Sequence, residues 1–190
     1  MKNLSLLFFS LILTLCAVAQ NGASKQIPAV DKSPLDVSYY PANYPILKIQ
    51  DRTLEPLIAR VIYSRPQKNG REVFGNLVEY NQIWRLGANE ATEIEFYRDV
   101  TLGTTKIKKG RYTLYAFPKP ESWTLIVNRD TDTWGSFKYD QAKDVARFDI
   151  KPEKITDSIE NFCIYFEKRT GGMSMIVQWD NVRAAVPFGF

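Results

Sequence analysis

The chain has 190 residues and carries 25 Lys and Arg against 21 Asp and Glu, with no histidine. A formal charge of +4, with acidic residues scattered among the basic ones, is too small for a nucleic-acid footprint. The absence of histidine excludes His-ligated zinc, copper and non-haem iron, and also Ser-His and Cys-His nucleophile pairs. We therefore expect no nucleic-acid partner, no metal and no cofactor.

Residues 1–19 predict a signal peptide. A short basic start precedes an apolar run over residues 4–18, and Ala-Val-Ala at 17–19 fits the small-x-small pattern of a cleavage site. The run is too short and too close to that site for a transmembrane span. Lipidation at Cys16 is disfavoured, because the bulky Leu15 stands where a small residue is usual. The sequence thus predicts an exported protein, periplasmic or extracellular, with no transmembrane span.

Residues 20–56 predict an extended, partly disordered leader, because prolines alternate there with small and polar residues. Tyrosines in the second half leave two readings open, a segment that lies against the domain and a simple tether. Cys163 is the only cysteine after the predicted cleavage, so no internal disulfide can form. It lies in an alternating apolar stretch, which favours an inert core position.

Alternation of apolar and polar residues dominates the chain from residue 57 onward, whereas no segment sustains a 3.6-residue apolar period. Asp180-Asn181 interrupts the last alternating run, as a tight turn or as a bulge. We predict one all-β domain over residues 57–190, an antiparallel β-sandwich or jelly-roll-like fold with about eight or nine strands and few short helical turns. The expected strands include 58–63, 93–98, 111–117, 123–128, 145–150 and 162–166, followed by 175–179 and 182–188.

Polar side chains gather among glycines in residues 60–92, a pattern typical of irregular loops that hold a specific geometry. Arg65 ends the first strand before Pro66 and could bind an anion bidentately. The alternative is a structural ion pair with a nearby glutamate at 72, 79 or 90. The expected binding residues are Arg65, Arg71, Arg85, Asn89, Glu90 and Trp134.

Glu90 is the candidate for acid–base chemistry. If the strand after Gly87 begins near Asn89, residues 90, 92, 94 and 96 share one face, and Glu90 lies at the rim of an apolar interior. Desolvation there suits a general acid or base. The alternative is that Glu90 pairs with Arg85 or Arg65 and fixes the loop to the sheet.

Residues 128–137 form a polar loop that ends in aromatic residues. Asp130-x-Asp132 resembles half a calcium loop, but the required later glycine and glutamate are missing, so no metal site is expected. Trp134 either offers a stacking surface for a sugar or base, or closes one end of the sandwich as a buried residue.

These residues and motifs resemble an exported bacterial family known as domain of unknown function 2911. The resemblance spans residues 58–188 and implies a signal peptide, a Gram-negative source of the Bacteroidetes type, and a periplasmic or surface location. It implies no activity or catalytic residue, and Leu86 departs from the small residue often found there. The matching segments are residues 63–66, 70–71, 74–78 and 84–92, then 110–112, 123–124, 134–135 and 142–144.

Three hypotheses follow for function. The first is a non-catalytic domain of the bacterial envelope that binds a small molecule, a glycan or an envelope protein in a polar pocket. The second is a hydrolase or lyase of envelope carbohydrate with Glu90 as acid or base, which needs a second carboxylate about 5 to 9.5 Å away. Asp99, Asp130 and Asp132 are the candidates. The third is a structural protein whose motif residues only hold loops together.

Overall fold

The computed structural model describes residues 27–52 and 55–190. The predicted signal peptide and Cys16 lie outside these residues. The folded unit described below comprises Asp31–Phe190. In the described part of the chain, no helix is both long and apolar enough to span a membrane.

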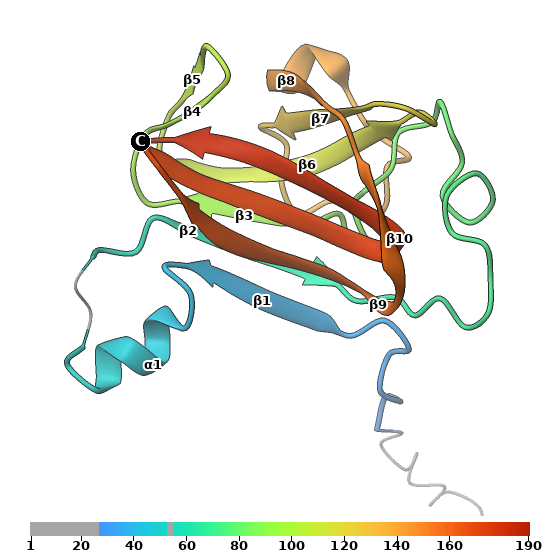
Figure 1. The fold of residues 1–190 in the computed structure, drawn as a ribbon, viewed down its shortest axis with the longest axis horizontal. Helices are drawn as coiled ribbons and strands as arrows, with labels where there is room; N and C mark the ends of the chain where they lie inside the picture. The colour runs from blue at the N-terminus through green and yellow to red at the C-terminus, as the bar shows by residue number, and fades with distance from the viewer. Residues whose placement is uncertain (1–26, 53–54) are drawn as a thin grey trace, which may run out of the picture. The chain divides into compact units, whose positions relative to one another are not determined.

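The first sheet has six antiparallel strands in the order β1-β2-β3-β6-β7-β8 (Figure 1). Neighbouring strands pair in register, as where Val61 of β2 faces Ile94 of β3 and Ile94 faces Tyr112 of β6. The sheet consists of β1 (Leu35–Tyr40), β2 (Ala59–Ser64), β3 (Glu93–Phe96), β6 (Gly110–Pro118), β7 (Trp123–Asn128) and β8 (Asp144–Ile150).

The second sheet has the order β5-β4-β10-β9. It consists of β4 (Val100–Leu102), β5 (Thr105–Ile107), β9 (Glu153–Arg169) and β10 (Gly172–Gly189). The two ends of β10 lie together, because the Phe190 amide donates to the Gly171 carbonyl at 3.3 Å. An extended run of that length cannot bring its ends together unless it reverses. The register with β9 shifts on both sides of Asp180, and the positive φ of 50° at this residue marks where β10 reverses.

The core lies between the two sheets and draws buried apolar residues from both. Alternate residues of β2 and β3, such as Val61 and Ile94, belong to the same buried cluster as Ile164 of β9 and Met175 of β10. The alternating pattern of the sequence therefore produces the two-layer packing expected of a sandwich. The predicted all-β antiparallel fold is confirmed, with ten strands in the described residues.

The segment expected to be a leader contributes to the fold. β1 pairs along its whole length with β2, from Leu35 opposite Ser64 to Tyr40 opposite Ala59. A short helix, α1 (Tyr44–Ile49), follows β1, and a single 3-10 turn, η1 (Gln141–Lys143), precedes β8. The sheet therefore begins upstream of residue 57.

Asp99 fixes the β4–β5 hairpin to the start of β6. Its Oδ1 accepts from the Lys109 amide at 2.9 Å, and its Oδ2 accepts from Lys108 Nζ at 3.1 Å. These two hydrogen bonds lower the pKa of Asp99 to about 2, and the bond from the Lys109 backbone amide contributes more than the bond from Lys108. We predict that the Asp99 carboxyl titrates in NMR with a midpoint near that value.

The lowered pKa of Asp99 makes the folding stability depend on pH. Because the ordinary pKa is 3.8, the stabilisation that the Asp99 carboxylate contributes is complete above pH 4, and it is lost as pH falls toward 2. The Asp99→Asn protein should lack this part of the pH dependence. A midpoint near 3.8 in the folded protein would contradict the hydrogen-bonding pattern.

Candidate functional site

Residues 84–92 form a loop that the backbone holds in an uncommon conformation. Trp84 makes an isolated antiparallel bridge to Ala116, with both amide–carbonyl bonds at 2.8 Å. Leu86, fully buried, has a φ of 53°, and Asn89 has a φ of 54°. Positive φ is uncommon for bulky residues and persists only where the surroundings impose it, a feature that clusters at functional sites.

Gly87 allows this loop to pack directly on the end of β2. A Cβ at Gly87 would lie 3.0 Å from the carbonyl oxygen of Ser64. The Gly87 carbonyl accepts from the buried Trp84 Nε1 at 3.2 Å, and the Leu86 carbonyl accepts from the Thr92 hydroxyl at 2.5 Å. These bonds fix the direction in which the intervening side chains leave the loop.

A small pocket of about 210 Å³ opens beside this loop, and we call it the arginine pocket. Arg71 and Arg85 supply its charged groups, while Trp84 and Trp179 form apolar wall. The backbone at Gly87 also lines it. Such a volume takes a small ligand or one functional group of a larger one.

Arg85 has one buried nitrogen without a polar partner in the described part of the chain. Its Nε is buried without a hydrogen bond among the described residues, and no carboxylate there forms an ion pair with it. Burial lowers the pKa of the Arg85 guanidinium from its ordinary value. Since arginine stays charged in proteins, the pocket carries a half-buried positive charge with an unmet donor.

Arg71 is held in place by the backbone instead of by an acid. Its Nε donates to the Lys68 carbonyl at 2.9 Å, and its Nη2 donates to the Gln67 carbonyl at 2.6 Å. Two carbonyl bonds orient the guanidinium without neutralising it. The arginine pocket therefore presents two guanidinium groups and no carboxylate from its lining residues.

Arg65 takes a different role. Its Nη1 lies 2.9 Å from Asp36 Oδ2, and its Nε donates to the Phe162 carbonyl at 3.2 Å. The sequence suggested an ion pair with a glutamate at 72, 79 or 90, but the acid comes from β1. Arg65 ties β1 and β9 to the end of β2.

Asn89, Glu90 and Trp134 lie together and do not line the arginine pocket. Asn89 Nδ2 donates to Asp31 Oδ1 at 2.9 Å, and the Asn89 carbonyl accepts from the Gly135 amide at 2.9 Å. Glu90 and Trp134 are antiparallel bridge partners. Trp134 is 62% exposed, so it does not close the end of the sandwich.

Glu90 is exposed, in contrast to the rim position that the sequence suggested. Thr92, Ile94 and Phe96 do share the buried face, but β3 begins only at Glu93. The left-handed backbone at Asn89 interrupts the alternation, so Glu90 leaves that face. It forms no described ion pair with Arg85 or Arg65.

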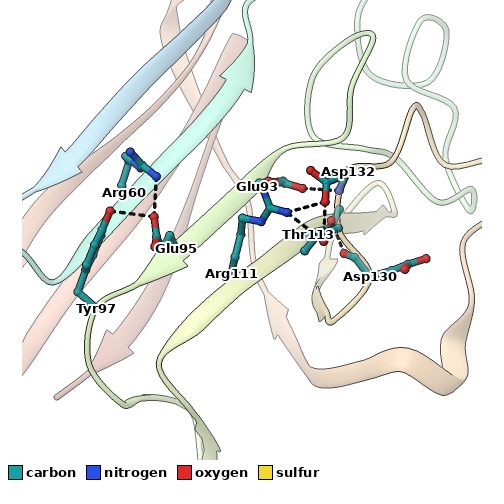
Figure 2. Close-up of polar contacts among 9 residues, drawn as sticks. Arg60, Glu93, Glu95, Tyr97, Arg111, Thr113, Asp130 and Asp132 are labelled. Atoms are coloured by element: carbon teal, nitrogen blue, oxygen red, sulfur yellow. Dashed lines mark hydrogen bonds and ion pairs between the residues drawn. The ribbon is translucent and has the colours of Figure 1, made fainter.

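Glu90 lines a second hollow together with Glu93 and Asp132. Arg111 contacts both of these last two acids (Figure 2), with Nη1 3.5 Å from Glu93 Oε2 and Nη2 2.5 Å from Asp132 Oδ2. The Asp132 amide also donates to Glu93 Oε1 at 2.6 Å. Both carboxylates are therefore engaged.

The same outer face of the sheet carries a second polar group, in which Arg60 Nη2 and the Tyr97 hydroxyl both contact Glu95 Oε2, at 2.6 and 2.8 Å (Figure 2). The other two carboxylates considered as partners of Glu90 in a hydrolase are also paired. Asp130 pairs with Lys143 at 3.0 Å, and Asp99 pairs with Lys106 of β5 at 3.4 Å. Within the described residues, no three acidic or cysteine side chains are placed to hold a metal.

Sequence reasoning missed one wall of the arginine pocket. Trp179 comes from β10 and stacks on Trp84, with ring centroids 6.4 Å apart. It reads in the sequence as an ordinary strand residue, and no local signal links it to the loop of Arg85. Only the pairing of distant strands brings the two tryptophans together.

The fold and this site define a two-sheet antiparallel sandwich with an arginine-lined pocket at one loop. Residues 48–188 match the family model described as Protein of unknown function (DUF2911), and the chain belongs to this family. The match includes Arg71 and Arg85 and leaves β1 outside. No curated protein and no solved structure matches the chain.

Proposed function

We propose that the protein binds a small anionic ligand, through a carboxylate or phosphate group, in the arginine pocket. The observation that carries the proposal is Arg85, a half-buried guanidinium that lines the pocket and pairs with no described carboxylate. A buried charge is costly unless a partner offsets it. An anion in the pocket would supply that partner, and guanidinium matches carboxylate and phosphate bidentately.

Arg71 adds to the argument because its position is fixed before any ligand arrives. The carbonyls of Gln67 and Lys68 hold two of its nitrogens and leave Nη1 without a described partner. A preorganised donor loses little conformational entropy on binding. Trp84 and Trp179 would contact the apolar part of the same ligand.

We place this activity in the bacterial envelope. The support is the signal-peptide pattern of residues 1–19, which predicts export to the periplasm or beyond. Ligands of that compartment that carry such groups include acidic sugars, peptide carboxylates and phosphorylated glycans.

A hydrolase centred on Glu90 has less support. Glu90 is exposed, and the two acids that share its hollow are engaged by Arg111. A purely structural role for the motif is also less favoured, because Arg85 forms no ion pair with a carboxylate among the described residues.

The test is a fluorescence titration of the Trp134→Phe protein, in which the exposed tryptophan no longer contributes background. Trp84 and Trp179 line the pocket, so their fluorescence reports a ligand that binds there. The probes titrated are phosphate, sulfate, acetate and succinate. We expect saturable quenching by at least one anion. Arg85→Ala should weaken it at least tenfold, since a hydrogen bond to a charged group contributes about 1.5–3 kcal/mol.

Arg169→Ala is the matched control, because Arg169 is exposed at the β9–β10 turn and its loss changes the net charge equally. It should bind as the parent protein does. The melting temperature of Arg85→Ala should stay unchanged or rise, because removal of an unpaired buried charge relieves a cost. A sharp fall in melting temperature, or equal weakening by both substitutions, would contradict the proposal.

A further inference from the structure

A third cavity, separate from the arginine pocket and from the hollow beside Glu90, lies between α1 and the end of β9, and we call it the α1 cavity. Its volume is about 270 Å³. Residues from the end of β1, the following turn, α1 and β9 form it. Its apolar lining consists of Tyr40, Pro41, Ala42, Tyr44, Leu47 and Phe166.

The lining of the cavity also includes three charged residues. Lys168 Nζ and Glu55 Oε1 form an exposed pair at 3.0 Å, and the Arg52 side chain contacts only Gln50 Oε1, at 3.4 Å, among the described residues. The three charges sum to +1. Burial, with the Glu55 carboxylate adding to it, raises the pKa of Tyr40, so its hydroxyl keeps its proton and remains a donor.

The helix beside the cavity contributes nothing to the core. No residue of α1 is buried, and Ile49 is 84% exposed. Tyr44 and Leu47 are only half-buried and line the cavity. Another hollow, of about 470 Å³, includes Pro45 and Ile46 of the same helix. The apolar side chains of α1 therefore have unused contact area that faces open space.

We propose that the α1 cavity binds a small amphipathic molecule, an alkyl or aryl chain that ends in one carboxylate. The chain would lie against Tyr44, Leu47 and Phe166, where burial of apolar area drives binding. The carboxylate would meet Arg52 and Lys168. A second anionic group would approach Glu55, so a singly charged ligand fits the net charge of the rim.

The probe pair is octanoate and octanol, which share an alkyl chain and differ in the head group, measured by calorimetric titration of the full domain. Octanoate should bind, and octanol should bind several-fold more weakly. Lys168→Ala should weaken octanoate binding about fivefold, in line with an exposed charge contact. Lys138→Ala, which removes an exposed lysine elsewhere, should leave it unchanged.

A second pair of variants tests the apolar wall. Leu47→Ser should weaken octanoate binding about tenfold, because it removes buried contact area. Ile49→Ser, at an exposed position of the same helix that does not line the cavity, should bind as the parent does. Equal binding of octanol and octanoate, equal effects within either variant pair, or a loss caused by Arg85→Ala instead would overturn the proposal.

Discussion

Trp84→Ala is expected to lower the free energy of unfolding by about 3–5 kcal/mol, the usual range for truncation of a buried tryptophan. Trp84 is 7% exposed and lies at the centre of an aromatic cluster. Its ring centroid lies 5.8 Å from those of Phe74 and Trp123, 5.5 Å from that of Phe162, and 6.4 Å from that of Trp179. Urea unfolding followed by circular dichroism measures the loss.

The substitution also releases the loop of the arginine pocket. Trp84 Nε1 donates to the Gly87 carbonyl, and without it that buried carbonyl loses its partner. Trp84→Phe would keep most of the apolar contact and lose only this bond and part of the ring, so its cost should be smaller.

Trp134→Ala is the matched control, because it removes the same side chain from a site that is 62% exposed. Its effect should stay within about 0.5 kcal/mol, as is usual for surface substitutions. Similar losses at the two positions would show that the aromatic cluster does not carry the stability assigned to it here.

The contrast between Trp84 and Arg85 separates stability from binding within two adjacent residues. Trp84 fills the core and holds the loop, whereas Arg85 leaves the loop toward the pocket with an unmet donor. The substitution at Trp84 should destabilise the protein without informing on binding. The other should remove binding and leave the fold intact, which is the arrangement expected when a rigid scaffold presents a functional side chain.

The alternating pattern predicted the sandwich because its strands bury one face each, as Val61 and Ile94 do. β1 escaped prediction for a physical reason. It is an edge strand between Pro34 and Pro41, and edge strands tolerate proline at their ends. Its outward residues Leu35 and Val37 are exposed, so its pattern gives no clear sign of a buried face.

The candidate site was predictable only in part. Glycine-rich, polar local sequence singled out the loop that carries Arg85, and it also included Arg71. It could not show that Asp36, from another strand, neutralises Arg65, or that no described carboxylate pairs with Arg85. Nor could it show that left-handed backbone at Asn89 turns Glu90 outward. Both depend on long-range pairing or on single dihedral angles, which residue types alone do not specify.

Gly172→Ala is expected to lower the free energy of unfolding by about 3 kcal/mol or more, at the upper end of overpacking costs. Gly172 is buried where the two ends of β10 meet. A Cβ there would lie 2.0 Å from the Phe188 carbonyl oxygen and 2.9 Å from the Gly189 Cα. Backbone atoms cannot rotate away as a side chain does, so the two ends of β10 must separate and the hydrogen bond from the Phe190 amide to the Gly171 carbonyl must lengthen.

The neighbouring Gly171→Ala distinguishes this clash from a general intolerance of the turn to side chains. Gly171 is exposed, a Cβ on it would meet nothing within 4 Å, and its φ is +71°. Only the left-handed backbone penalises alanine there, at about 1 kcal/mol. Urea unfolding of the two variants should therefore differ by about 2 kcal/mol. Equal losses would mean that the ends of β10 are not in close contact, and the reversal of β10 at Asp180 would then be wrong.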